Sequence, residues 1–196
     1  MNERLAKRPN REIPLSSKKY IYQSATIGVR PLDYYDLQGG YCYWFNDMAT
    51  CRYNSHGNYP MHIATLQRYL DNLATDQSKC VWAIDDIHLS KHIGNISLQS
   101  IHSIYRNAEF AIIIGESDYR GKQIGLMATR WLFKHGFERL NLHRIYCGTA
   151  STNQGMIKLA EKLGMRNEGC LRDAAFLDGY YVDLIQFGIL KKEFTV

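Results

Sequence analysis

The stretch from Glu109 to Phe133 restricts the fold of this chain more than any other feature of its sequence. After Glu109 it continues with the apolar run Phe-Ala-Ile-Ile-Ile, passes through a polar turn that holds Gly121 and Gly125, and ends in a segment with apolar residues at helical spacing. A nearly continuous apolar run is typical of a central strand that is covered on both faces. The stretch therefore predicts a buried strand, a glycine-containing loop and the start of an amphipathic helix.

The loop of this unit has the properties of a phosphate-binding site. The first turn of a helix carries free N–H groups and the positive end of the helix dipole, so it can hold a pyrophosphate. Gly121 and Gly125 let the backbone approach the phosphates closely, and Arg120 and Lys122 add positive charge. The glycine spacing matches neither a dinucleotide-binding fingerprint nor a P-loop, so an ordinary strand-to-helix turn stays open as an alternative at this point.

Strands and helices alternate along the rest of the chain. Apolar periodicity and turn signals predict strands at 20–30, 80–84, 92–100, 108–114, 143–148, 165–172 and 181–191, and helices at 33–46, 62–75, 121–136 and 153–163. Asp33 is the expected cap of the first helix, which Gly39 and Gly40 interrupt, and Asp178-Gly179 is the expected turn of the last hairpin. The pattern predicts one α/β domain over residues 20–196.

The first residues of the chain differ from the rest in charge. The net charge of the chain is +5, and much of the excess of basic over acidic residues lies in this segment. It holds Arg4, Lys7, Arg8, Arg11, Lys18 and Lys19 against Glu3 and Glu12. We expect residues 1–19 to form a basic, flexible extension and not a nucleic-acid-binding segment. No apolar run approaches the ~20 residues needed to cross a bilayer, and the N-terminus lacks the apolar middle of a signal peptide. We therefore expect a cytosolic protein without a membrane partner.

Two motifs in order resemble the GNAT superfamily of N-acetyltransferases. The run Arg120-Gly-Lys-Gln-Ile-Gly125 is similar to the pyrophosphate loop of that family, and Asn153-Gln-Gly-Met-Ile-Lys-Leu-Ala-Glu-Lys-Leu-Gly-Met165 is similar to its second motif. Trp44-Phe-Asn-Asp47 and the segment 168–183 resemble the branch that acetylates ribosomal-protein N-termini, spermidine and nucleotide-linked amino sugars. The resemblance implies a twisted mixed sheet of six or seven strands, with two splayed central parallel strands, flanked by about four helices.

The resemblance also implies a cofactor and a mechanism. Acetyl-CoA would place its pyrophosphate on Arg120, Gly121, Lys122, Gln123, Ile124 and Gly125, and its pantetheine arm between strands 109–114 and 143–148. Backbone N–H groups near Ile112 and Ile114 would polarise the thioester, and the amine would attack directly. No His or Cys pair has the spacing of a metal site, so no metal is expected.

Two residues are the candidates for catalytic roles. Glu109 could accept a proton from the substrate ammonium, or it could be a solvated strand-end charge or a partner of Arg106. Asn153 could lie near the cofactor arm, as the family implies, and it could equally cap the following helix. Ala160 stands where many family members carry a tyrosine that protonates the leaving thiolate, so the general acid is unassigned. Gln123 stands where the family usually has glycine, and it can still offer its N–H to a phosphate if its φ is negative.

The side chains around the acceptor are less well defined by the sequence. A tyrosine cluster precedes the central strand and is expected to cover the acceptor site, although a partly buried amphipathic surface explains it equally well: Tyr34, Tyr35, Tyr41, Tyr43 and Tyr53. The seven histidines are interpreted as surface or core residues. The expected activity is transfer of an acetyl group from acetyl-CoA to a protein N-terminus. A small amine or nucleotide-linked amino sugar is the alternative acceptor, and a non-catalytic acyl-CoA-binding protein is the alternative of another class. A homodimer is compatible with each.

Overall fold

The structure is a computed structural model, and it describes residues 19–195. The expected basic extension, residues 1–19, lies outside the described residues except for Lys19. The strands are β1 (Tyr22–Gln23), β2 (Ile27–Pro31), β3 (Cys80–Asp86), β4 (Lys91–His102), β5 (Asn107–Ile114), β6 (Arg144–Ala150), β7 (Arg166–Leu177) and β8 (Tyr180–Leu190). The α-helices are α1 (Tyr41–Trp44), α2 (Met48–Cys51), α3 (Ile63–Leu73), α4 (Ile124–Glu138) and α5 (Gln154–Lys162). Single turns of 3₁₀ helix are η2 (Tyr34–Gln38), η3 (His56–Asn58), η4 (Ser117–Tyr119) and η5 (Lys191–Glu193).

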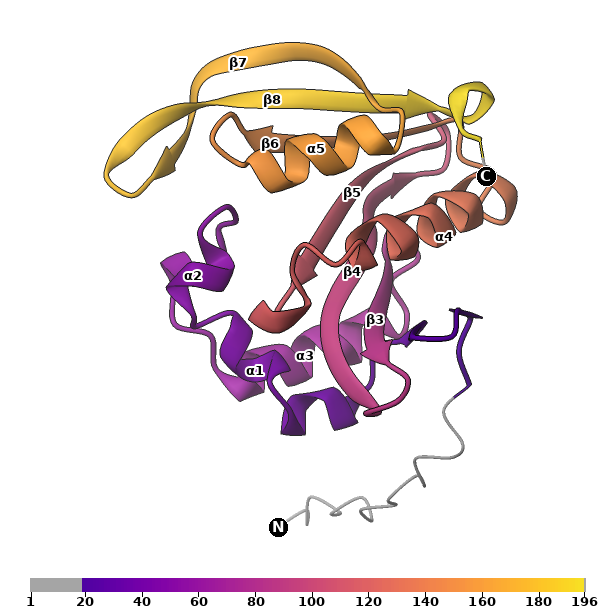
Figure 1. The fold of residues 1–196 in the computed structure, drawn as a ribbon, viewed down its shortest axis with the longest axis vertical. Coiled ribbons are helices and arrows are strands. Elements are labelled where there is room, and N and C mark those ends of the chain that lie inside the picture. The colour runs from indigo at the N-terminus through magenta and orange to yellow at the C-terminus, as the bar shows by residue number, and fades with distance from the viewer. Residues whose placement is uncertain (1–18, 196) are drawn as a thin grey trace, which may run out of the picture.

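All described strands form one mixed sheet in the order β1-β2-β3-β4-β5-β6-β8-β7. Every neighbouring pair is antiparallel except β5 and β6, which are parallel. The predicted mixed, twisted α/β fold is confirmed (Figure 1). The sheet has eight strands where six or seven were expected.

The additional strand arises because the segment predicted as one strand, 20–30, is a hairpin of β1 and β2. The Ser24 hydroxyl accepts hydrogen bonds from the N–H groups of Thr26 and Ile27, at 3.2 and 3.1 Å, and so makes the turn without a glycine or a proline. The segment predicted as one helix, 33–46, is likewise two short turns, η2 and α1, separated by Gly39 and Gly40. Asp33 is the N-cap residue of η2, as expected.

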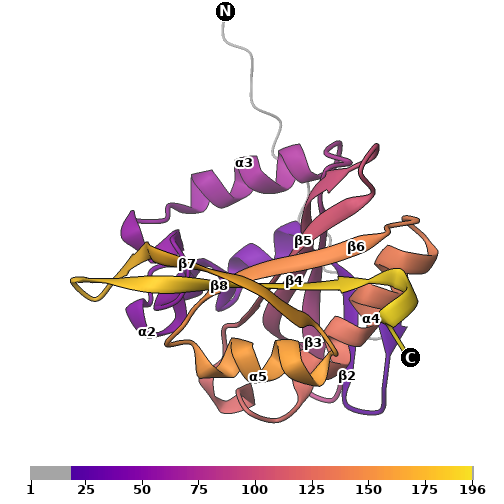
Figure 2. The same cartoon turned by 90° about the horizontal axis from the view of Figure 1, so that it is seen from above.

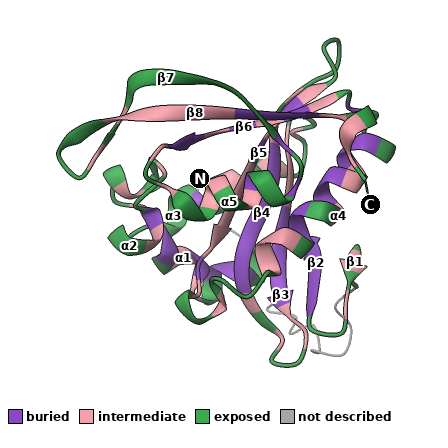
Figure 3. Cartoon of the chain, turned by 45° about the horizontal axis from the view of Figure 1, so that its top comes forward, coloured by how far each residue is buried: buried purple, intermediate pink, exposed green. Residues whose placement is uncertain are grey.

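Helices cover both faces of the sheet and enclose two separate cores (Figure 2). Helices α4 and α5 pack on one face, where the buried side chains include Ile96, Leu98, Phe110, Ala128, Leu132, Phe133 and Ala160. Helices α1 and α3 pack on the other, where they include Tyr41, Trp44, Phe45, Leu66, Leu70 and Ala83. Purple buried residues accordingly run through β2, β3, β4 and one side of α4, whereas most of β7 is exposed (Figure 3). No helix in residues 19–195 is both long enough and apolar enough to span a bilayer.

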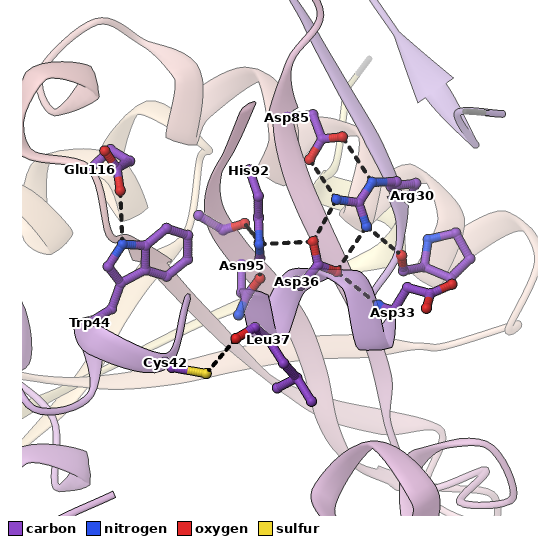
Figure 4. A network of polar contacts seen from close by, with 12 residues as sticks. Arg30, Asp33, Asp36, Leu37, Cys42, Trp44, Asp85, His92, Asn95 and Glu116 are labelled. Carbon is purple, nitrogen blue, oxygen red and sulfur yellow. Dashed lines mark hydrogen bonds and ion pairs between the residues drawn. The ribbon is translucent and has the colours of Figure 1, made fainter. Parts of the chain in front are cut away.

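A buried ionic network fixes η2 on the sheet (Figure 4). Arg30 of β2 donates two hydrogen bonds to the Asp85 carboxylate, at 2.8 and 2.9 Å, and two to the Asp36 carboxylate, at 2.9 and 2.7 Å. His92 Nδ1 lies 3.1 Å from Asp36 Oδ1, a distance that allows an ion pair when the ring is protonated, although the angle is not that of a hydrogen bond. On the other side, His92 Nε2 lies 2.7 Å from Asn95 Oδ1. The network therefore connects β2, β3, β4 and η2 in one unit.

This network makes the stability of the domain depend on Arg30. We expect Arg30→Met to lower the free energy of unfolding by about 3–5 kcal/mol, because it leaves two buried carboxylates without their cation. The control is Arg52→Met, which removes the arginine of an exposed pair with Asp178 and should cost less than about 1 kcal/mol. Urea denaturation measures both. An equal, small loss in the two variants would show that the network contributes little to stability.

The same network predicts a pH dependence. Burial opposes ionisation of Asp36, but the hydrogen bonds from Arg30, together with the adjacent His92 ring, hold its pKa well below the ordinary value. A depressed carboxyl pKa adds stability that is present above the unfolded-state pKa of about 4 and is lost as the pH falls through the folded-state value. The contribution of Asp36 to the free energy of unfolding should therefore be constant between about pH 5 and 7 and decline below about pH 4. If the contribution of Asp36 to the free energy of unfolding already declined near neutral pH, its pKa would not be lowered in the folded protein.

Candidate functional site

The parallel strands β5 and β6 separate after a short stretch of pairing. They are in register only at Asn107↔Arg144, Ala108↔Ile145 and Glu109↔Tyr146, although β5 continues to Ile114 and β6 to Ala150. On their outer sides both stay paired, β5 with β4 and β6 with β8. The facing edges beyond Glu109 thus offer backbone N–H and C=O groups that need partners. An extended ligand with amide groups can lie along these edges.

The loop before α4 lies at the far end of this gap and has the form of an anion-binding turn. Gly121 has a φ of +77°, and no atom lies within 4 Å of the position that a Cβ would take, so the space beside it is open. Among the described residues, no hydrogen bond is made by the N–H groups of Ile124, Gly125 or Leu126 at the start of α4. These groups and the helix dipole can hold phosphate oxygens.

Gln123 does not have the negative φ on which donation of its N–H to a phosphate was expected to depend. Its φ is +61°, in the left-handed region, where a negative value was required. The reason is local: Gln123 is the N-cap of α4, and the chain turns there from the 121–122 segment into the helix. A side chain in this conformation costs roughly 1–2 kcal/mol relative to the ordinary helical region. The position that the family fills with glycine therefore also has a glycine-like backbone here.

The two basic residues of the loop are placed differently. The Arg120 guanidinium turns back onto the end of β5, where it donates to the carbonyls of Ile114 and Gly115, at 3.0 and 3.3 Å, and to Thr50 Oγ1 at 2.8 Å. It therefore ties α2, β5 and the loop together. Lys122 Nζ lies 5.6 Å from the centre of the Tyr119 ring, and the Lys122 residue is exposed. Of the two, Lys122 is the side chain left to meet an anion from solvent.

The end of the loop, at Gly125, packs close to both β5 and α5. A Cβ built on Gly125 would lie 3.4 Å from Ile112 Cδ1 and 3.9 Å from Leu159 Cδ2, so α4, α5 and β5 meet at this glycine. Ile112 and Ile114 are half-buried and pack against the α4–α5 core. The structure thus brings the predicted loop residues and these two isoleucines together around the end of β5.

A pocket of about 270 Å³ lies on the other face of the sheet, under α1–α3. Its floor is formed by β4 and β5, and its walls come from α1, α3, β3 and the segment after α2. The lining residues are Tyr41, Phe45, Asn54, His56, Met61, Thr65, Leu66, Tyr69, Lys79, Val81, Asn95, Ser97, Gln99, Ala111, Ile112 and Ile113. Of the predicted tyrosine cluster, only Tyr41 lines it, and Tyr43 is 75% exposed.

Glu109 lies on the same face as this pocket, next to its floor. It pairs with Gln99 across the strands, and it is two residues from Ala111, so the three side chains point to one face of the sheet. Glu109 is half-buried, and within residues 19–195 it has neither an ion pair nor a side-chain hydrogen bond, so the pairing with Arg106 is not formed. It is also the last residue of β5 in register with β6. A carboxylate with these neighbours can accept a proton from a group in the pocket.

Asn153 and Ala160 have structural positions on α5. Asn153 caps the helix: its Oδ1 accepts from the N–H of Met156 at 3.2 Å, and its Nδ2 donates to Thr149 Oγ1 at 3.1 Å. The capping role is confirmed, and both ends of the amide are engaged. Ala160 is fully buried in the α4–α5 core, where it has no group that could donate a proton.

Sequence analysis missed the polar floor of the pocket. Asn95, Ser97 and Gln99 alternate with Ile96 and Leu98 along β4, and the first two are almost completely buried. The sequence signal for this floor was the alternation itself: polar residues stand at every second position of a strand whose two faces are both covered. His56, interpreted as a surface or core residue, lines the pocket, and burial lowers its pKa.

Comparison with known proteins agrees with this geometry. The family model described as an acetyltransferase (GNAT) domain matches residues 26–166. The spermidine N(1)-acetyltransferase of Escherichia coli (strain K12) is 28% identical over 170 residues, which are 86% of this chain and 88% of that protein. The putative ribosomal N-acetyltransferase YdaF of Bacillus subtilis (strain 168) is 33% identical over 100 residues, 51% of this chain and 54% of that protein. The structure of spermidine N-acetyltransferase from Vibrio cholerae in complex with CoA and spermine aligns with a TM-score of 0.80 at 26% identity, covering 87% of this chain and 98% of that one.

The loop geometry predicts how substitutions at Gly125 affect CoA binding. Asp and Asn have nearly the same shape, but only Asp places a negative charge beside the phosphates, so Gly125→Asp should bind CoA at least about tenfold more weakly than Gly125→Asn. An acidic residue in the first turn stabilises a helix, so the Asp variant should unfold at no lower temperature than the Asn variant. Isothermal titration calorimetry with CoA measures the difference. Equal affinities in two folded variants would place the pyrophosphate elsewhere.

Proposed function

Since this chain belongs to the GNAT family of acetyltransferases, we propose that its acceptor is a small primary amine that binds in the pocket under α1–α3. The chain is an acetyl-CoA-dependent N-acetyltransferase. Acetyl-CoA would lie along the facing edges of β5 and β6, with its pyrophosphate on residues 120–125. Asn153, at the start of α5, would support the arm of the cofactor from the β6 side.

The observation that carries the proposal is the position of the pocket relative to the gap. Ala111, Ile112 and Ile113 line the pocket, and they belong to the part of β5 that has left β6. A thioester held along this edge and an amine held in the pocket would therefore meet at the same strand. The volume of about 270 Å³ lies just below the usual range for small-molecule sites, roughly 300–1,000 Å³. A small acceptor fits these dimensions better than a folded protein terminus.

Glu109 is the proposed general base. It would take a proton from the substrate ammonium, and the neutral nitrogen would then attack the carbonyl carbon of the thioester as its N–C bond forms. Backbone N–H groups at Ile112 to Ile114 would stabilise the negative charge on the carbonyl oxygen. The C–S bond then breaks and the thiolate of CoA leaves. The nitrogen loses a second proton as the amide forms. Ala160 cannot relay that proton, so water is proposed to carry it to the thiolate.

A protein N-terminus is the second candidate acceptor. The similarity to the putative ribosomal N-acetyltransferase of B. subtilis supports it, and that similarity covers about half of each chain. The similarity to two spermidine acetyltransferases covers most of each chain and supports the small amine. Thiol release from acetyl-CoA, measured with small amines and with short peptides from ribosomal-protein N-termini, distinguishes them. Acetylation of the peptides alone would reject the small-amine proposal.

The role of Glu109 predicts a selective loss of turnover. Glu109→Gln keeps the shape of the side chain and removes its basicity, so kcat should fall about 10²–10⁴-fold while the affinity for CoA stays the same. Glu161→Gln, the same change at an exposed position of α5, is the control and should leave both unchanged. Initial rates with the best acceptor found, together with calorimetry, provide the measurement. Turnover at the parental rate in Glu109→Gln would assign Glu109 a structural role.

A further inference from the structure

The charge of the acceptor pocket restricts which amines it can take. In the part of the chain that the structure describes, residues 19–195, no aspartate or glutamate lines the pocket. Its polar groups are amides and hydroxyls, and its one ordinarily charged residue is a cation, Lys79. Partial burial lowers the pKa of His56, which disfavours the charged form of its ring. The pocket thus has hydrogen-bonding capacity without negative charge.

Two carboxylates in the elements around the pocket already have cationic partners. Asp36 is held by Arg30, and Asp76 forms an ion pair with Lys79 at 3.3 Å. Glu109, beside the floor, is available to the reacting amine. A polyamine carries further ammonium groups, and each would have to enter the pocket without a carboxylate partner. Burying a charge without a partner is costly.

The aromatic walls do not replace the missing carboxylates. An ammonium group can bind over an aromatic ring, but the Lys79 ammonium already lies 5.7 Å from the centre of the Tyr69 ring. The Phe45 ring makes edge contacts with the rings of Tyr41 and His56, at 5.2 and 4.8 Å between centroids. These rings offer apolar surface for the C–H groups of a ligand. The resident cation at Tyr69 would repel a second one.

We infer that the acceptor is an amine carried on an uncharged, polyhydroxylated ring, an amino sugar in chemical terms, and not a polyamine. This inference rests on the proposed function, because it takes the pocket as the acceptor site. The amide and hydroxyl groups of the floor and walls would hydrogen-bond the ring hydroxyls: Asn54, Asn95, Ser97 and Gln99. The aromatic walls would cover the apolar face of the ring. Its amine would point to Glu109.

The position of Asn95 supports recognition of a neutral polar ligand. Its Oδ1 lies 2.7 Å from His92 Nε2, so the buried network with Asp36 and Arg30 fixes the orientation of the amide. A fixed amide at the floor is suited to hydroxyl groups at defined positions. The same ionic network that fixes η2 on the sheet therefore also orients a recognition group of the pocket.

The experiment compares acceptors and adds a carboxylate to the pocket. Thiol release from acetyl-CoA is measured with glucosamine, spermidine and tyramine, an aromatic amine without the sugar hydroxyls. Glucosamine should give a kcat/KM at least about tenfold above that of either other amine, because only it satisfies the buried polar groups without an unpaired charge. A higher kcat/KM for spermidine or tyramine in the parent enzyme would overturn the inference and leave the small-amine proposal standing. Acetylation of none of the three, with acetylation of peptides, would instead reject the proposed function.

A matched pair of variants tests the charge argument directly. Thr65 is exposed at the pocket mouth in the first turn of α3, where an acidic residue is compatible with the helix. Thr65→Glu should raise kcat/KM for spermidine about fivefold over Thr65→Gln, the worth of one partly exposed ion pair, and should change the glucosamine value less than about twofold. If the two variants have the same kcat/KM for spermidine, the absence of a carboxylate from the pocket does not set the specificity, and the inference fails.

Discussion

The structure depends on the point at which β5 and β6 stop pairing, after Glu109 and Tyr146. Both strands stay in the sheet through their outer neighbours, so the gap between them is stable without a ligand and exposes two backbone edges. Backbone groups in such a position need hydrogen-bond partners, and an extended chain with amide groups provides them. The gap also brings the loop before α4 and the pocket under α1–α3 to the same segment of β5, from opposite faces of the sheet.

Two kinds of interaction hold the elements on either side of this gap. On the α4–α5 face, apolar packing is sufficient, because the helices are long and their buried sides continuous. On the other face the helices α1 and α2 have only four residues each, too short to be stable alone. The buried ions Arg30, Asp36 and Asp85 fix this region from one end, and the Arg120 bonds to Thr50 and the end of β5 fix it from the other. The pocket under α1–α3 is lined by residues of this region.

Much of the fold, and the strand–loop–helix unit proposed to hold the cofactor, could be predicted from sequence, because their signals are local. The run from Glu109 to Gly125 contains its strand, loop and helix start, and Asn153 caps its own helix. The pocket proposed for the acceptor could not be predicted, because its floor on β4 and its walls on α1 and α3 are far apart in the chain. The hairpin at Ser24 was missed for a related reason: a serine hydroxyl makes the turn, and the turn residues 24–26 include neither glycine nor proline. The left-handed backbone of Gln123 could not be predicted either, because glutamine seldom adopts this conformation and its presence gives no signal for it.

We propose that the arm of CoA lies along the separated edges of β5 and β6. Amide hydrogen exchange, followed with and without saturating CoA, tests this position. We expect slower exchange in residues 110–114 and at the start of α4, with no change in β3, which is paired on both sides already. Unchanged exchange in residues 110–114 under conditions where CoA is bound would contradict the claim, because the cofactor would then lie elsewhere on the molecule.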